Sequence, residues 1–119
     1  MTKTHFEQLS DLNIDFFESA KNSLLDPLGL YLANDVQWIK LNEKWNSLKF
    51  PVVIGGKGQP ILLLHGFDSS FLEFRRIYQS LERNFQVIIP DLLGFGFCPR
   101  CATNEYNPSK IISYLIDLL

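Results

Sequence analysis

The pair His65-Gly66 has the clearest chemical potential in this sequence. An apolar run, Ile61 to Leu64, leads directly into the pair, and Phe67 follows it. Such a run is typical of a central strand of a parallel sheet, with helices covering both faces. The glycine allows a sharp turn at the strand's carboxyl end and leaves the next N–H exposed. Because ligands of open α/β sheets bind at this edge, we interpret the segment as the floor of an active site.

A second polar motif follows the next apolar run, residues 85–90. Asp91 ends that run, and Gly94 and Gly96 come shortly after it. A carboxylate at a strand end could act as a catalytic acid, but it more often accepts backbone N–H groups and fixes a loop. We therefore interpret these three residues as loop-shaping. A dinucleotide fingerprint is excluded, because the third glycine is missing and no helix is expected to begin there.

The two cysteines, Cys98 and Cys101, have the spacing C-x-x-C. This spacing occurs in redox pairs and as half of a zinc site. A zinc site would need two further ligands, and the sequence has no second C-x-x-C and no H-x-x-H. A thioredoxin-like pair would begin a helix, whereas these cysteines are expected in a loop. Two loop thiols are the favoured interpretation, with a labile disulfide as the alternative, and we expect no metal and no cofactor.

Residues 1–33 are expected to form a helical N-terminal segment. Thr4 and Glu7 have the spacing of a capping box. Asp15 is expected to restart a second helix, which Asp26-Pro27 would end. The segment is amphipathic, so it could bind a partner or a membrane surface. Packing on its own protein is the favoured interpretation.

The rest of the chain, residues 34–119, is expected to form an incomplete α/β domain. Strands are predicted at 36–41, 48–54, 61–64 and 85–90, with helices beginning near Ser70 and Asn107. Ser70 and Glu73 have a second capping-box spacing. The glycine-rich stretch 55–58 fails the P-loop pattern and predicts a tight turn between strands. The alternation of strand and helix from Ile61 onward indicates parallel crossover units.

These motifs together resemble the α/β-hydrolase fold superfamily. The resemblance rests on the segments 62–67 and 87–96, covers roughly residues 50–119, and involves only the amino-terminal part of such enzymes. It implies an α/β fold in which two antiparallel lead-in strands precede parallel strand-helix units. It also implies cofactor-independent hydrolysis of an ester or similar bond in a small apolar substrate, through a covalent intermediate.

The resemblance assigns a role to each residue of the first motif. The backbone N–H of Phe67 would be one donor of the oxyanion hole, and Gly66 would let the backbone approach the substrate. His65 would brace the loop by hydrogen bonding and not act as the base. Phe67 stands where haloalkane dehalogenases typically have Asn, and Asp68 where many epoxide hydrolases have Pro. Esterase, lipase-like and C–C-bond hydrolase chemistry therefore stay open.

The second half of the catalytic machinery is not found in this sequence. Such enzymes need a nucleophile elbow, usually G-x-S-x-G, followed by an acid and a histidine. No serine here has a glycine two residues before it, and the two histidines, His5 and His65, precede every position for the elbow. We expect an amino-terminal portion of a hydrolase that is inactive alone and leaves an apolar, aggregation-prone sheet edge. The alternative is a non-catalytic fragment or interaction module that binds a partner, of unknown identity, through its N-terminal helices.

Composition excludes several other classes. The chain has 119 residues, 46% of them hydrophobic, and a net charge of -2. This charge offers no basic surface for nucleic acid. No stretch approaches the roughly 20 apolar residues of a spanning helix, and residues 1–5 lack the apolar core of a signal peptide. We therefore expect a cytoplasmic protein without a transmembrane segment.

Overall fold

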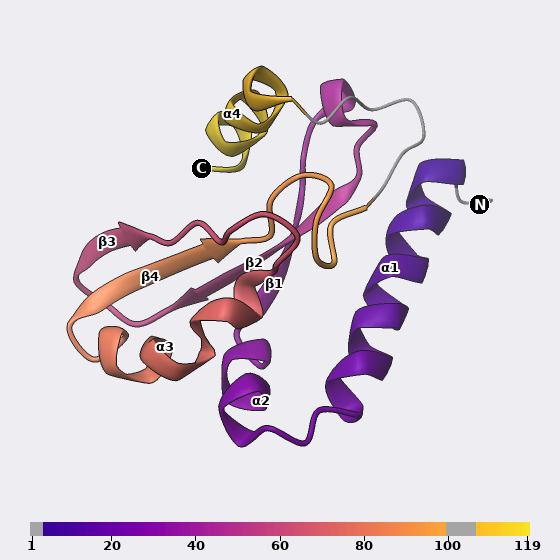
Figure 1. The fold of residues 1–119 in the computed structure, drawn as a ribbon. Coiled ribbons are helices and arrows are strands. Elements are labelled where there is room, and N and C mark those ends of the chain that lie inside the picture. The colour runs from indigo at the N-terminus through magenta and orange to yellow at the C-terminus, as the bar shows by residue number, and fades with distance from the viewer. Residues whose placement is uncertain (1–3, 100–106) are drawn as a thin grey trace.

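The structure is a computed structural model that describes residues 4–99 and 107–119. The elements are α1 (His5–Asn22), α2 (Pro27–Ala33), β1 (Val36–Lys40), η1 (Glu43–Trp45), β2 (Lys49–Gly55), β3 (Gln59–Leu62), η2 (Phe71–Phe74), α3 (Arg75–Leu81), β4 (Phe85–Pro90) and α4 (Pro108–Leu118). The elements η1 and η2 are short 3-10 helices. Figure 1 shows one sheet with α2 and α3 on one face and α4 on the other.

The strands form a mixed sheet in the order β1-β2-β4-β3. The pairs β1–β2 and β2–β4 are antiparallel, and β3 pairs with β4 in parallel. Between β3 and β4 the chain passes through η2 and α3, as a parallel connection requires. The predicted fold class, with antiparallel lead-in strands followed by a parallel strand-helix unit, is confirmed.

One expectation about β3 is wrong for the described residues. The segment was expected to be a central strand covered on both faces, but β3 lies at the edge of the sheet. Leu62 and Leu64 are 41% and 46% exposed. Leu63 points to the opposite face, packs against the core, and donates its N–H to the Ile88 carbonyl. An apolar strand edge, as the sequence predicted, is therefore present.

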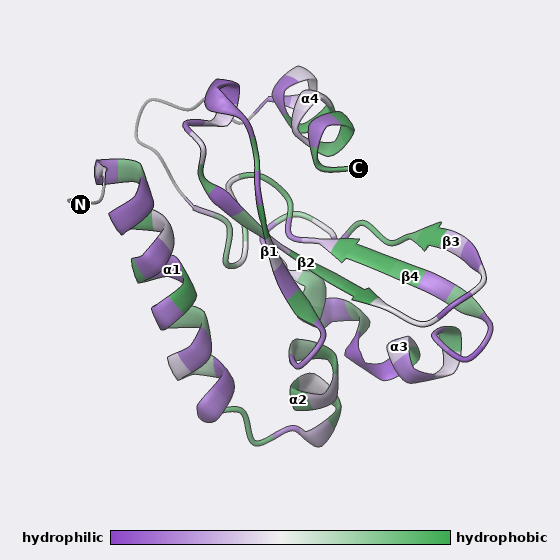
Figure 2. Cartoon of the chain, turned by 180° about the vertical axis from the view of Figure 1, so that it is seen from behind, coloured by the Kyte–Doolittle hydropathy of each residue, from purple (hydrophilic) through white to green (hydrophobic). Residues whose placement is uncertain are grey.

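Two hydrophobic clusters fill the two faces of the sheet because neighbouring strand residues point to opposite sides. Val52 belongs to the cluster under α4, and Val53 belongs to the cluster under α2 and α3. We call the first the Trp45 cluster; its buried residues are Leu41, Trp45, Leu48, Phe50, Val52, Leu93, Cys98, Tyr114 and Leu118. We call the second the Phe17 cluster; its buried residues are Phe17, Leu32, Ala33, Val53, Phe71, Tyr78, Val87 and Ile89. Figure 2 shows β4 as hydrophobic along most of its length, whereas α1 alternates hydrophobic and hydrophilic bands.

The N-terminal helices differ from the expected arrangement. The capping box of Thr4 and Glu7 is present, so α1 begins as predicted. Asp15 does not begin a second helix. It is an exposed residue inside α1, which continues without a break from its N-cap, Thr4, to Asn22. Asp26-Pro27 begins α2 and ends no helix. The Asp26 side chain accepts the N–H of Leu28, and proline occupies the first turn, where its missing N–H costs nothing.

Helix α1 contacts both clusters. Phe6 and Leu9 pack against the Trp45 cluster, and Phe17 is a buried member of the second cluster. The ring of Phe17 meets those of Trp38 and Phe97 edge to face. None of the helices in residues 4–99 and 107–119 combines the length and apolar character needed to cross a membrane.

Candidate active site

The loop after β3 carries the first predicted motif and lies at the carboxyl end of the parallel strands. His65 is buried, at 5% exposure, whereas Gly66 and Phe67 are exposed. The Phe67 side chain is 91% exposed, and its ring meets that of Phe95 edge to face at 5.3 Å between centroids. Among the described residues, the N–H of Phe67 has no hydrogen-bond partner. This donor is therefore available to a ligand.

The His65 ring joins this loop to the loop after β4. Its Nε2 accepts the backbone N–H of Leu92 at 2.9 Å. The proton of the neutral ring is therefore assigned to Nδ1, which donates to the Gly66 carbonyl at 2.8 Å. Although Nε2 also lies 3.9 Å from Asp91 Oδ1, a neutral ring that accepts at this nitrogen forms no ion pair. Both ring nitrogens are engaged, so the ring has no free nitrogen with which to take a proton from a nucleophile.

Asp91 is a fully buried carboxylate that ties three segments together. Its Oδ1 accepts the N–H of Phe71 and its Oδ2 accepts the N–H of Phe97, both at 2.7 Å. Its backbone carbonyl accepts bonds from the Tyr114 hydroxyl at 3.0 Å and from the Cys98 thiol at 3.2 Å. With both oxygens engaged by backbone donors, this carboxylate fixes the start of η2 and the loop after β4.

The two glycines of the second motif have backbone conformations that favour glycine. Gly94 has φ 90° and Gly96 has φ 56°. A Cβ on Gly96 would lie only 2.3 Å from Asp91 Oδ2. The close approach of this backbone to the carboxylate explains why the loop needs a glycine at position 96.

Glu73 lies at the site in a way that sequence reasoning missed. The predicted capping box of Ser70 and Glu73 is not formed. Ser70 caps the 3-10 turn η2 by accepting the N–H of Leu72. The Glu73 carboxylate turns instead to the first motif and accepts the N–H of Gly66 at 3.2 Å. The reason is the tight 3-10 turn, which differs from the α-helical turn that a capping box closes; no sequence signal indicated the contact.

Asp68, directly after Phe67, has φ 58°, a left-handed conformation that is uncommon for residues other than glycine. Strained backbone of this kind is concentrated at functional sites. Beside it lies an open cavity of about 600 Å³, lined by Asp68, Ser69, Ser70, Leu72, Glu73, Arg75, Gly96 and Phe97. The cavity lies beside the first motif without being lined by His65, Gly66 or Phe67, and it reaches Gly96 of the second motif.

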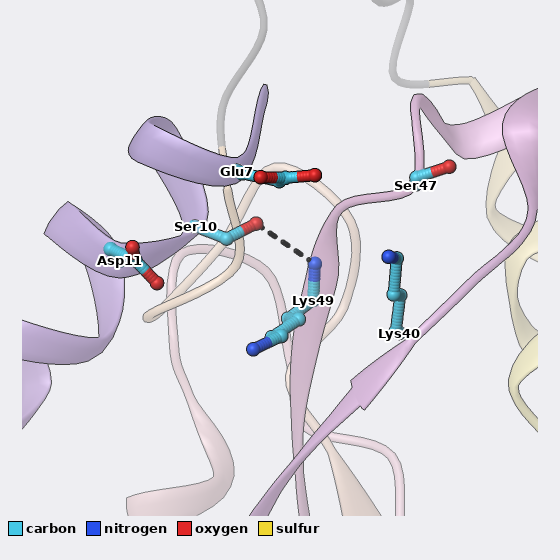
Figure 3. A pocket seen from close by; sticks show the side chains of 6 residues that line it. All are labelled: Glu7, Ser10, Asp11, Lys40, Ser47 and Lys49. Atoms are coloured by element: carbon cyan, nitrogen blue, oxygen red, sulfur yellow. Dashed lines mark hydrogen bonds between the residues drawn. The ribbon is translucent and has the colours of Figure 1, made fainter. Parts of the chain in front are cut away.

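A second cavity, of about 190 Å³, shares no lining residue with the first and is drawn in Figure 3. It lies between α1 and the strands β1 and β2, and its lining residues are Glu7, Ser10, Asp11, Lys40, Ser47 and Lys49. Lys40 and Lys49 are cross-strand neighbours, and Ser10 accepts the backbone N–H of Lys49. Two acidic residues of α1 thus face two lysines of the sheet, an arrangement that favours docking of the helix more than binding of a ligand.

The cysteine motif is only partly described. Cys98 lies in the loop after β4 and is a thiol, as predicted; its side chain is buried, and its sulfur lies 3.6 Å from the Tyr114 hydroxyl. Burial follows from its contacts with Asp91 and Tyr114. Cys101 lies outside the described residues, and the state of the pair stays a prediction. Within residues 4–99 and 107–119 no cluster of three metal-ligating side chains occurs.

The mixed sheet, the His-Gly loop and the loop after β4 define a partial α/β-hydrolase fold, and comparisons with known proteins support this classification. No protein-family model matches the chain. Lipase 3 of Moraxella sp. strain TA144 is 40% identical over 62 residues, which are 52% of this chain and 19% of that lipase. The soluble epoxide hydrolase of Corynebacterium sp. strain C12 is 41% identical over 51 residues, which are 43% of this chain and 18% of that enzyme.

A solved structure agrees with these relatives. The meta-cleavage product hydrolase of Pseudomonas fluorescens IP01 superposes with a TM-score of 0.60 at 26% identity, covering 69% of this chain and 30% of that one. The predicted resemblance is confirmed: the chain partially matches α/β-hydrolase fold proteins, over their N-terminal part only. It spans about a fifth of the length of the two relatives named above.

Proposed function

We propose that this chain forms the oxyanion-hole portion of a cofactor-independent α/β-hydrolase that cleaves an ester or similar bond. The relatives named above include a lipase and an epoxide hydrolase. We propose ester chemistry on the basis of the similarity to the lipase, and we assign no particular substrate. The nucleophile, the acid and the base would come from residues other than these 119.

The observation that carries the proposal is the unengaged N–H of Phe67 on a peptide that His65 holds. A donor fixed before the substrate arrives stabilises the charge that develops on the carbonyl oxygen in acyl transfer. The exposed ring of Phe67 and the half-buried ring of Phe95 beside this donor favour a small apolar acyl group.

The test uses the native gene product with two variants at one position. Phe67→Pro removes the N–H, whereas Phe67→Ala keeps the N–H and removes only the exposed ring. The proline variant should lose about 100- to 1000-fold in kcat toward a p-nitrophenyl ester, the effect of removing one oxyanion donor. The alanine variant should stay within a few fold. Equal activity of the proline variant and the wild type would refute the assignment.

The competing function is an interaction module without catalysis, and one observation favours it. Leu12 and Phe16 on α1 are each 66% exposed, which gives the helix an apolar outer surface. A fluorophosphonate probe separates the two functions. Labelling of a serine in the native product supports the hydrolase, whereas capture of a stable partner through α1 with no labelling supports the module.

A further inference from the structure

Both peptide groups that flank Gly66 are held by side chains. The Gly66 carbonyl accepts a hydrogen bond from Nδ1 of His65 at 2.8 Å, and the Gly66 N–H donates to Oε2 of Glu73 at 3.2 Å. A Cβ placed on Gly66 would lie 3.6 Å from Oε1 of Glu73, in ordinary contact, so the carboxylate rests directly against this residue. Gly66 is thus fixed from both sides.

The first of these bonds controls the oxyanion donor directly. The Gly66 carbonyl and the Phe67 N–H belong to one planar peptide unit, so fixing one fixes the other. A hydrogen bond to the carbonyl also polarises the unit and strengthens the N–H as a donor. The second bond controls the neighbouring unit, between His65 and Gly66. Without it, glycine would allow the two planes to rotate freely about its Cα.

We propose that Glu73 is a positioning residue for the Phe67 N–H. This inference rests on the proposed function and names a residue to which that function assigns no role. The side chain acts through Gly66: its oxygen limits rotation at the glycine and keeps the Phe67 N–H directed at the substrate. Its charge acts in the opposite direction, because a carboxylate near the developing oxyanion raises the energy of that negative charge.

The two effects of Glu73 are separable by substitution. Glu73→Gln keeps an oxygen acceptor for the Gly66 N–H and removes the charge. Glu73→Ala removes both. Glu43→Ala is the matched control. It removes an exposed carboxylate from η1 and so makes the same change in net charge, but on an element other than the one that carries Glu73.

The experiment measures amide exchange and kinetics on the native gene product. In Glu73→Ala the N–H of Gly66 should exchange about fivefold faster, as expected for the loss of one hydrogen bond. Its kcat should fall about 10- to 100-fold with little change in KM, since a small misalignment is costly in the transition state. Glu73→Gln should match or exceed the wild-type kcat and keep slow exchange, and Glu43→Ala should resemble the wild type in both.

Two results would overturn the inference. One is unchanged exchange and kcat in Glu73→Ala; the other is a glutamine variant as impaired as the alanine variant, which would assign the effect to charge. A wild-type product without ester turnover would refute the proposed function and with it the catalytic role of Glu73. The exchange rates would then still decide whether Glu73 holds Gly66, so the two failures are distinguishable.

Discussion

The carboxylate of Asp91 lies where a side chain on residue 96 would have to be. A Cβ on Gly96 would lie 2.3 Å from Oδ2 and 2.7 Å from Oδ1. Because the same two oxygens accept the N–H groups of Phe71 and Phe97, any displacement of the carboxylate affects both loops of the candidate site. The glycine at position 96 and the acid at position 91 thus form one structural unit.

Gly96→Ala should destabilise the protein by at least about 2 kcal/mol, because the new methyl group meets both a left-handed backbone and the Asp91 oxygens. Urea denaturation of the native product measures the effect. The matched control is Gly29→Ala in α2, where the nearest atom to a new Cβ is 3.7 Å away. That change should be neutral or stabilise by about 0.5–1 kcal/mol. Equal effects of the two substitutions would contradict the prediction.

Asp91→Asn should destabilise the protein by about 2–3 kcal/mol, since an amide offers one oxygen and an NH₂ group to two backbone donors and leaves one N–H unsatisfied. Both donors, on Phe71 and Phe97, are bound at 2.7 Å in the wild type. The same denaturation experiment measures this loss. A change of less than 0.5 kcal/mol, within the usual range of surface substitutions, would show that Asp91 does not hold the two loops.

Burial, followed by its neighbour Cys98, raises the pKa of Tyr114 well above its ordinary value of 10.0. A raised pKa means that the stabilisation is complete below pH 10.0 and is lost as the pH rises above it, where the unfolded chain ionises first. Tyr114→Phe cannot ionise at this position. The free energy of unfolding of the wild type, minus that of the variant, should therefore be constant from pH 7 to 9 and fall above pH 10. A constant difference up to pH 11 would contradict the assignment.

The exposed edge of β3 predicts poor solubility of the 119-residue chain, and Leu64→Lys should improve it. Leu64 is 46% exposed two residues beyond the end of the edge strand β3, and an added charge there opposes edge-to-edge association. Leu63→Lys is the control, because its side chain packs against the Phe17 cluster and a lysine there should unfold the chain. Light scattering at increasing concentration separates these outcomes. If the Leu64→Lys variant associates as strongly as the wild type, the edge of β3 is not the cause of the poor solubility.

The 119 residues alone should not hydrolyse p-nitrophenyl esters. The sequence has no nucleophile elbow, and both nitrogens of His65 are engaged by backbone groups. A burst of product from the purified chain, proportional to its concentration and absent in Phe67→Pro, would overturn this expectation.

Periodicity and capping residues predicted most of the elements, since they act locally. The strands, the start of α1 at Thr4 and the start of α4 at Asn107 follow from side chains within a few residues. The contacts of Glu73 could not be predicted in the same way. Its carboxylate could accept a hydrogen bond either from the Ser70 N–H at the start of its own helix or from the Gly66 N–H. Which bond forms depends on how tightly the intervening chain turns.

The position of β3 at the sheet edge has a similar explanation. An apolar run predicts burial on both faces, but the pattern does not indicate which strands are present to cover it. The partners of Asp91 come from residues 71, 97, 98 and 114. Phe71 and Tyr114 are 20 and 23 residues from Asp91, so these two contacts leave no local spacing for a sequence pattern to detect.

The contact between η1 and α4 has a consequence for synthesis on the ribosome. Trp45 donates its indole N–H to Asp117 at 2.7 Å, across a separation of 72 residues, and its ring packs against Tyr114. At roughly 5–20 residues per second, the helix that covers Trp45 emerges roughly 4–14 s after the tryptophan does. During that interval the apolar side of the lead-in strands is open to chaperones and to neighbouring nascent chains. Translation speed across residues 46–117 should therefore influence the yield of folded protein.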